Sequence, residues 1–292
     1  MNTMPHVIRF TKKMYRKMMP ASIRQSRWIT KLKQSLLWHQ MMYDLDYYDS
    51  QVEGPSSRSA PTISESIYTE FFPKRVVDVG CGTGALLEKL RDRGCEVLGL
   101  DYSEAALLFC RVRHLNVLKF DLGKEVFTDT SRFDVAISLE VAEHLPAEVA
   151  DRYVDLLTRL SSVIIFSAAR PGWGGMDHVN EQPPSYWITK FKRRGFEHEE
   201  TLSKRWSEQW KASGTVASYY YKHLMIFVHF SARQQASVHY LTKHAETFTA
   251  LLTRDHQPAA LTAAGLVVPE IRNHYLIHRN TMKLKRKYQN SM

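Results

Sequence analysis

The chain has 292 residues, 44% of them hydrophobic and 24% charged, which suits one globular domain with extensions or two small domains. No apolar run approaches the roughly 18 residues that a membrane-spanning helix needs, and three cysteines without paired spacing exclude a disulfide framework and a zinc ribbon. The formal net charge of +10 favours an anionic partner, such as nucleic acid, an anionic membrane surface or an acidic glycan. The cysteine content predicts a reducing compartment, and we expect the cytoplasm.

Residues 1–43 contain no acidic residue, and their hydrophobic residues recur at helical spacing among nine lysines and arginines. Such a basic amphipathic segment is typical of helices that lie on an anionic membrane. It is also typical of a mitochondrial targeting peptide, which would place the protein in mitochondria. In a third interpretation, a helical pair packs its apolar face on the main domain. The sequence leaves these three alternatives open.

The rest of the chain predicts alternating helices and short apolar strands. Residues 51–61 are rich in Gly, Pro and Ser and are interpreted as a linker. Helices are predicted over 61–71, 83–93, 103–111, 146–160, 184–194 and 231–254, and strands over 75–79, 96–100, 115–120, 133–139, 162–167, from 195 and over 223–230. This alternation predicts an α/β fold in which helices cover both faces of a parallel sheet.

Three parts of the chain follow from this pattern. Residues 1–58 are predicted to form a basic helical extension with its linker, and residues 59–230 the α/β domain. Residues 231–292 are predicted to form a helical C-terminal extension that ends in a basic tail.

A glycine-rich loop, Gly80-Cys81-Gly82-Thr83-Gly84, follows the first buried strand. Glycines at this position let the backbone turn tightly and approach a ligand closely. The loop also fits a dinucleotide fingerprint, G-x-G-x-x-A. Asp78 argues against that interpretation, because a carboxylate two residues before the first glycine would repel a pyrophosphate and attract a cationic or amine-bearing ligand.

Two more acidic residues stand at the ends of the next strands. Asp101 ends the second strand about 20 residues after the loop, where a carboxylate can grip a ribose diol. Asp121 follows the third strand and is placed to reach an adenine amino group. The three acids and the glycine loop, in this order at strand ends, predict a nucleoside-bearing cofactor.

Potential metal ligands follow the fourth strand. Glu140, Glu143 and His144 are spaced i, i+3 and i+4, so on a helical turn they would project from one face. Two carboxylates and an imidazole suit a divalent metal. His178, in the loop after the fifth strand, is the candidate fourth ligand, and Asp177 beside it is expected to orient its ring.

With these motifs, residues 60–230 resemble a class I S-adenosylmethionine-dependent methyltransferase. The resemblance implies a doubly wound, Rossmann-like sheet of seven strands with an antiparallel last strand, here residues 223–230. It also implies that S-adenosylmethionine is the cofactor. Asp78 to Gly84, including Gly80, Cys81 and Gly82, would hold its methionine part. Asp101 would bind the ribose, and Asp121 with Leu122 the adenine; Tyr102 and Glu140 are also expected at the cofactor.

The set Glu140, Glu143, His144 and His178 resembles the ligands of two groups of methyltransferases. One group methylates the terminal 2′-hydroxyl of small RNAs, and the other acts in the ubiquinone pathway. The resemblance implies a magnesium or similar ion that lowers the pKa of the acceptor hydroxyl. The same segment also occurs in metal-free relatives, and in that alternative His144 or His178 would act as a general base.

The acceptor atom is predicted to be oxygen, because no Asn/Asp-Pro-Pro-Tyr/Phe motif follows the fourth strand. We expect a hydroxyl of a sugar, a glycan or another small metabolite. A loop with Trp173 among glycines could close over such a substrate. Two alternatives stay open, an RNA 2′-O-methyltransferase and a catalytically inactive cofactor-binding subunit.

Overall fold

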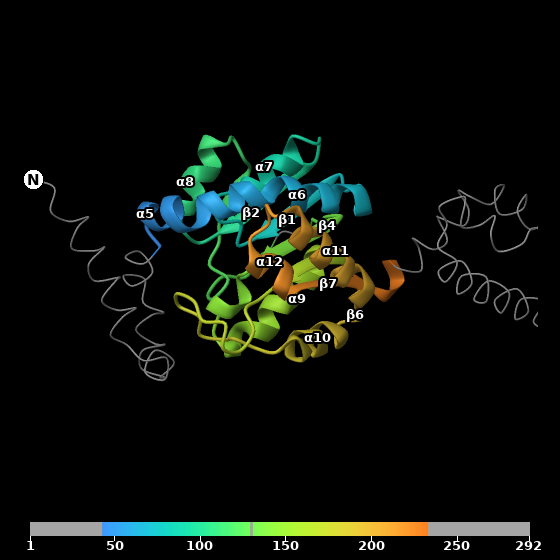
Figure 1. Cartoon of the computed structure of the whole chain (residues 1–292). Helices are drawn as coiled ribbons and strands as arrows, with labels where there is room; N and C mark the ends of the chain where they lie inside the picture. The colour runs from blue at the N-terminus through green and yellow to red at the C-terminus, as the bar shows by residue number, and fades with distance from the viewer. Residues whose placement is uncertain (1–42, 129–130, 233–292) are drawn as a thin grey trace, which may run out of the picture. The chain divides into compact units, whose positions relative to one another are not determined.

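The computed structural model describes residues 43–128 and 131–232, which fold around one seven-stranded sheet (Figure 1). The strand order is β3-β2-β1-β4-β5-β7-β6. Neighbours from β3 to β5 run parallel, and β7 runs antiparallel to both β5 and β6. The strands are β1 Arg75–Val79, β2 Glu96–Asp101, β3 Val117–Lys119, β4 Val135–Leu139, β5 Val163–Ser167, β6 Phe196–His198 and β7 Leu224–His229. The predicted doubly wound, seven-stranded fold with an antiparallel last strand is confirmed.

Helices cover both faces of this sheet, as the nearly continuous apolar strands predict. The α-helices are α5 Leu45–Tyr47, α6 Gly54–Phe71, α7 Ala85–Arg91, α8 Glu104–Val112, α9 Ala150–Leu160, α10 Pro184–Lys192, α11 Glu200–Ser213 and α12 Ser218–His223. A π-helix, η1 Tyr48–Glu53, and two 3₁₀ turns, η2 Ala142–His144 and η3 Ala147–Val149, complete the set.

The two-residue period of the strands separates two hydrophobic layers. On one face of the sheet, Val76 packs with α6, α7 and α11. On the other face, Val77 and Val79 pack with α9 and α10. Figure 1 shows this division, with α6 and α7 above the sheet and α9 and α10 below it. Because both faces are closed, a ligand can enter only at the strand ends.

The predicted linker at residues 51–61 is wrong, since η1 and α6 run through it and across the predicted boundary at 58/59. Pro55 stands in the first turn of α6, where a missing N–H costs nothing. Pro61 lies inside the helix, but Ile63 and Ile67 are fully buried against the sheet. This tertiary burial outweighs the local helix-breaking preference of the Gly, Pro and Ser residues.

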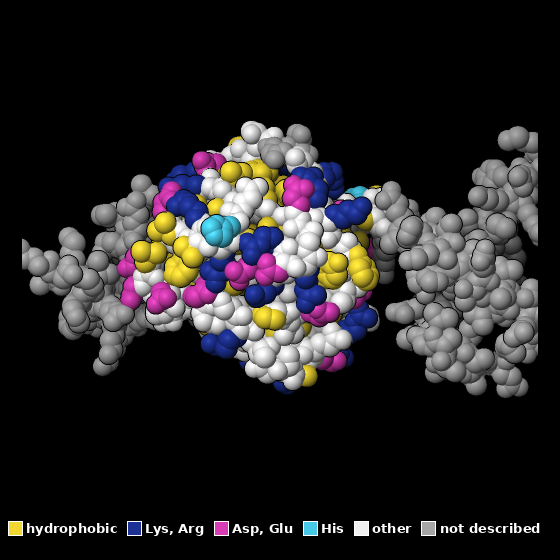
Figure 2. Space-filling model, turned by 90° about the horizontal axis from the view of Figure 1, so that it is seen from above, with side chains coloured by type: hydrophobic (Ala, Val, Ile, Leu, Met, Phe, Trp, Pro, Cys, Tyr) yellow, Lys and Arg dark blue, Asp and Glu magenta, His cyan; other side chains and the backbone are white. Residues whose placement is uncertain are grey.

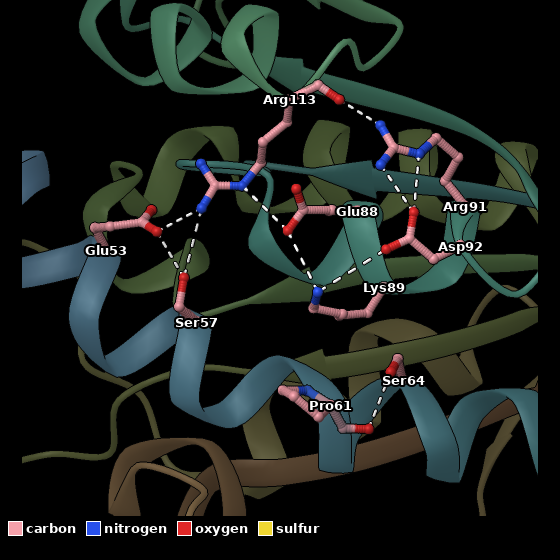
Figure 3. A network of polar contacts seen from close by, with 9 residues as sticks. All are labelled: Glu53, Ser57, Pro61, Ser64, Glu88, Lys89, Arg91, Asp92 and Arg113. Carbon is pink, nitrogen blue, oxygen red and sulfur yellow. Dashed lines mark hydrogen bonds and ion pairs between the residues drawn. The ribbon is translucent and has the colours of Figure 1, made fainter.

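An ionic network fastens the start of this helical segment to the domain (Figure 3). The guanidinium of Arg113 contacts Glu53 at the end of η1 and lies 3.6 Å from Glu88 on α7. Its Nη2 also lies 3.5 Å from the hydroxyl oxygen of Ser57 on α6. Arg113 therefore joins three helical segments, η1, α6 and α7.

The sequence analysis named no element between residues 199 and 222, yet α11 and α12 lie there. Trp206 and Trp210 are one helical turn apart on α11 and are fully buried, and Gly214 ends the helix in a left-handed conformation. Leu202, Trp206 and Trp210 repeat every four residues, so the signal for this helix was present in the sequence.

The predictions for the basic segment 1–43, apart from Tyr43, and for residues 233–292 lie outside the described residues. The chain divides into two units, Met1–Phe230 and Ser231–Met292, and only the first contains the sheet. None of the helices described here is long and apolar enough to cross a membrane.

Gly84 offers a test of the close packing beneath the glycine loop. Its φ is +77°, and an added Cβ would lie 2.5 Å from Leu115 Cδ1 and 2.8 Å from Cys110 Sγ. Gly84→Ala combines backbone strain with overpacking and should lower the free energy of unfolding by about 2–4 kcal/mol.

The matched control is Gly94→Ala, because Gly94 also has a positive φ but no atom within 4 Å of an added Cβ. Backbone strain alone predicts a loss of about 1–2 kcal/mol. Urea unfolding of both variants measures the difference. Equal losses would show that the space around Gly84 is not restrictive.

Candidate functional site

A cavity of about 740 Å³ opens at the carboxyl ends of β1, β2 and β4. The strand order reverses between β1 and β4, because the chain winds outward to β3 and then returns to continue with β4 and β5. Ligands of doubly wound sheets bind at this switch point. The loops after β1, β2, β4 and β5 all line the cavity, together with η1 and α12.

The glycine loop forms the floor of the cavity. The N–H groups of Gly80 and Cys81 both donate to the carbonyl of Leu100, which holds the loop against β2. A Cβ on Gly80 would lie 2.4 Å from Val141, so only glycine fits there. Gly80, Cys81 and Gly82 line the cavity, whereas Gly84 does not. Gly84 serves the packing beneath the loop rather than the ligand surface.

The acidic residues predicted at the strand ends lie around the same cavity. Asp101 accepts N–H hydrogen bonds from Gly82 and Ser103, both of 2.9 Å, so its carboxylate is fixed beside the glycine loop. Tyr102, Asp121 and Leu122 line the wall beyond it. The residues that the sequence assigns to the ribose and the adenine therefore share one side of the cavity.

Asp78 lies buried at the end of β1, next to the loop. Burial, and to a smaller extent the charge of Asp101, raise the pKa of Asp78 to about 8. Burial also raises the pKa of Asp101 to about 6. A cationic ligand beside these carboxyls would favour their charged forms. The ammonium and sulfonium groups of S-adenosylmethionine meet that requirement, so the residues fit this cofactor.

A second cluster lines the same cavity as the glycine loop. Glu143, His144 and His178 offer ligand atoms that all lie within 4.8 Å of one another. Glu143 is fully buried, and neither of its carboxylate oxygens has a hydrogen-bond partner among the described residues. Burial and the neighbouring Glu140 raise its pKa. A bound cation would compensate this buried carboxylate, so the donor set fits a divalent metal ion.

The backbone brings His178 to this cluster. The N–H groups of Val179 and Asn180 both donate to the carbonyl oxygen of Glu143, at 2.9 and 3.0 Å. These bonds seat the loop after β5 on the η2 turn. The rings of His144 and His178 then meet edge to face, with centroids 4.9 Å apart.

Glu140 is not among the residues whose ligand atoms all lie within 4.8 Å of one another, although its carboxyl neighbours that of Glu143, so its role as a metal ligand stays a prediction. Its φ is +58°, so the backbone turns away before η2 begins and Glu140 does not share a helical face with Glu143 and His144. Its carboxylate instead lies 3.2 Å from Nδ1 of His223, at the end of α12. Glu140 still lines the cavity.

The structure places a second carboxylate beside His178. Nδ1 of His178 lies 2.8 Å from Oε1 of Glu181, and the charge of the neighbouring Asp177 also acts on the imidazole, so the role expected of Asp177 stays a prediction. Burial lowers the pKa of His178, while Glu181 opposes that shift. The sequence analysis missed Glu181 because it stands outside the glycine-rich segment that drew attention to His178.

Aromatic residues that the sequence analysis did not name complete the cavity. They are Tyr43, Tyr47, Tyr48, Tyr219 and Tyr220. The hydroxyl of Tyr43 lies 3.3 Å from Nδ1 of His144. Trp173, which is 40% exposed, packs edge to face on His223 with centroids 4.5 Å apart. Runs of tyrosine at 47–48 and 219–221 were the available signal for this aromatic wall.

Comparison with known proteins matches residues 77–162 to the model of a family described as Methyltransferase domain. A ubiquinone biosynthesis O-methyltransferase of Glaesserella parasuis is 39% identical over 85 residues, which cover 26% of this chain and 36% of the relative. One of Hahella chejuensis is 28% identical over 148 residues, or 47% of this chain and 56% of the relative. The chain thus matches only a third to just over half of these relatives' length.

Solved structures of methyltransferases are also similar. A magnesium protoporphyrin IX methyltransferase from Synechocystis PCC 6803 with bound SAH covers 69% of this chain and 98% of its own, at 18% identity and a TM-score of 0.48. Residues 77–162 thus match a methyltransferase domain, and the seven-stranded order around the glycine loop is the order that the resemblance to class I S-adenosylmethionine-dependent methyltransferases implies.

The raised pKa of Asp78 predicts that cofactor affinity depends on pH. Below about pH 8 the carboxyl is protonated and must lose its proton to face a cation. The affinity for S-adenosylmethionine should therefore rise with pH, by at most about tenfold per unit, and level off above pH 8. Calorimetry with wild type and Asp78→Asn measures it.

The informative quantity is the ratio of the two affinities, because it cancels the titration of the ligand's own amino group. We expect the ratio to grow in favour of wild type between about pH 6 and pH 8. A ratio that stays constant over this range would show that Asp78 does not meet the cofactor's charge.

Proposed function

We propose that this protein is an S-adenosylmethionine-dependent O-methyltransferase whose acceptor is a hydroxyl on a small aromatic molecule of the quinone-precursor type. One observation carries the proposal: the cluster of Glu143, His144 and His178 shares a single cavity with the glycine loop. The donor of the methyl group and a site able to activate a hydroxyl would then face each other.

The lining of the cavity supports an aromatic acceptor. Six tyrosines and Trp173 line the cavity. The relatives described above are named for ubiquinone biosynthesis, and their names contain no sugar or glycan. We therefore propose a hydroxyl on an aromatic ring as the acceptor, in place of the sugar or glycan hydroxyl that the sequence analysis expected.

Charge also supports a small acceptor over RNA. Acidic residues outnumber lysines and arginines within residues 43–230, so the positive charge of the whole chain resides in the terminal segments. On the face that Figure 2 shows, basic and acidic side chains are interspersed and form no continuous basic surface. RNA binding by phosphate contacts would need such a surface.

The residues of the site form two groups with different proposed roles. Gly82, Asp78 and Asp101 would hold and orient the cofactor, which supplies an electrophilic methyl group. Glu143, His144 and His178 would hold a divalent ion, which lowers the pKa of a hydroxyl beside it. The aromatic wall excludes water and aligns the acceptor, and this alignment contributes much of the rate of a methyl displacement.

The test is turnover on a panel of ortho-dihydroxybenzenes, simple polyols and an RNA oligonucleotide, with and without EDTA. We expect methylation of the aromatic acceptors, a loss of at least about tenfold with EDTA, and recovery when Mg²⁺ or Mn²⁺ is added back. Glu143→Gln should lower activity by a similar factor or more and should not respond to added metal.

Glu200→Gln is the matched control, because it makes the same chemical change at an exposed carboxylate at the start of α11. Full activity in EDTA would contradict the metal site and favour His144 or His178 as a general base. Cofactor binding without turnover on any acceptor would contradict the enzymatic function itself and leave a binding subunit.

A further inference from the structure

The side chain of Glu181 is 8% exposed, and its two oxygens meet three N–H donors from the loop after β5. Oε2 accepts from the N–H of Gly172 at 2.9 Å, and Oε1 accepts from the N–H of Gly174 at 2.8 Å. Oε1 also lies 2.8 Å from Nδ1 of His178. One carboxylate thus contacts both the loop that carries Trp173 and the imidazole in the second cluster.

The contact with Glu181 determines which nitrogen of His178 can serve the cavity. A carboxylate only accepts hydrogen bonds, so Nδ1 must carry the proton. In a neutral imidazole the lone pair then resides on Nε2. A carboxylate behind a histidine fixes the ring and its tautomer in this way at many metal sites.

The opposite side of the ring is fixed by the backbone. A Cβ on Gly175 would lie 2.2 Å from Nε2 of His178 and 2.3 Å from Cε1. Gly175 does not have the left-handed φ of Gly172 and Gly174, so its role is to leave space rather than to permit a turn. The imidazole is therefore held between the backbone at 175 and the carboxylate of Glu181.

Trp173 stands between the two glycines that Glu181 binds. Its indole packs on His223, and the ammonium of Lys222 lies 4.9 Å from the ring centroid. The Trp173 ring is thus held by contacts with α12, and its backbone is held by Glu181, which binds the glycine on each side of it.

We infer that Glu181 is a positioning residue that couples the placement of Trp173 to the orientation of His178. One carboxylate would then position both the Trp173 ring at the acceptor site and the His178 ligand at the cation site. This inference rests on the proposed function for its consequence in turnover. The coupling itself concerns only the geometry of the loop, and it can be tested without an acceptor.

The test uses the full-length protein and three readouts. The ¹⁵N shifts of the His178 ring report its tautomer, the indole ¹⁵N–¹H signal of Trp173 reports the loop, and titration with Co²⁺ alone reports the cation site. The variants His178→Gln and Trp173→Phe assign the two signals. In wild type we expect His178 to carry its proton on Nδ1.

Glu181→Gln should change all three readouts, because the amide NH₂ that replaces one oxygen cannot accept a hydrogen bond. We expect a moved or broadened Trp173 signal, a shift of the His178 tautomer and a Co²⁺ affinity lower by about 10–100-fold. Glu181→Asp keeps the charge but shortens the reach, and should give intermediate values. Cofactor affinity should stay at the wild-type level, as should the values for the exposed control Glu200→Gln.

Gly175→Ala separates the effect on His178 from the effect on Trp173. It should displace His178 and lower the Co²⁺ affinity while the Trp173 signal stays in place, because Glu181 still binds Gly172 and Gly174. A Glu181→Gln protein with the wild-type Trp173 signal or the wild-type tautomer overturns the inference. If wild type has the expected tautomer but binds no Co²⁺, the metal site of the proposed function fails and the coupling stands.

Discussion

Three buried carboxyl groups and the partly buried Glu140 lie at one edge of the sheet, and the site depends on how their negative charge is compensated. Asp78, Asp101, Glu140 and Glu143 all line a single cavity, and burial raises the pKa of each of them. Removing a carboxylate from water without a partner is costly, so such groups persist where ligands or neighbours compensate them. Backbone N–H groups compensate Asp101, and His223 faces Glu140. Asp78 and Glu143 are the two carboxyls that suit cationic ligands, and both line the cavity.

The sequence predicted the fold well and placed Asp78, Asp101 and the glycine loop together at the strand ends, because both depend on local patterns. Short apolar strands, a glycine loop and acids at strand ends are all readable within a few residues, and parallel strands bring their carboxyl ends together wherever the helices lie. The helix α6 was predicted over 61–71 but not over 54–60, because the continuous helix is stabilised by burial against residues far away in sequence. Local composition there indicated a linker.

The acceptor side was predicted less completely for a different reason. Glu140, Glu143 and His144 were placed on one helical face, but the left-handed φ of Glu140 breaks that face, and nothing in the residue type announces it. Glu181 and His223 act through contacts between loops and elements that only the tertiary structure brings together. Spacing within one segment cannot predict a partner that comes from another segment.

The direction of β7 has a consequence for how such a domain can diversify. Because β7 runs antiparallel to β5, the beginning of β7 lies near the carboxyl ends of the parallel strands, and α12, which precedes β7, delivers Tyr219 and Tyr220 to the cavity. Under the proposed function, the first part of the sheet would hold the cofactor, and a late segment, residues 170–223, would form much of the acceptor wall. The family match covers residues 77–162 and leaves that late segment outside. Substitutions and insertions after β5 would then change the acceptor wall and leave the residues proposed to hold the cofactor in place.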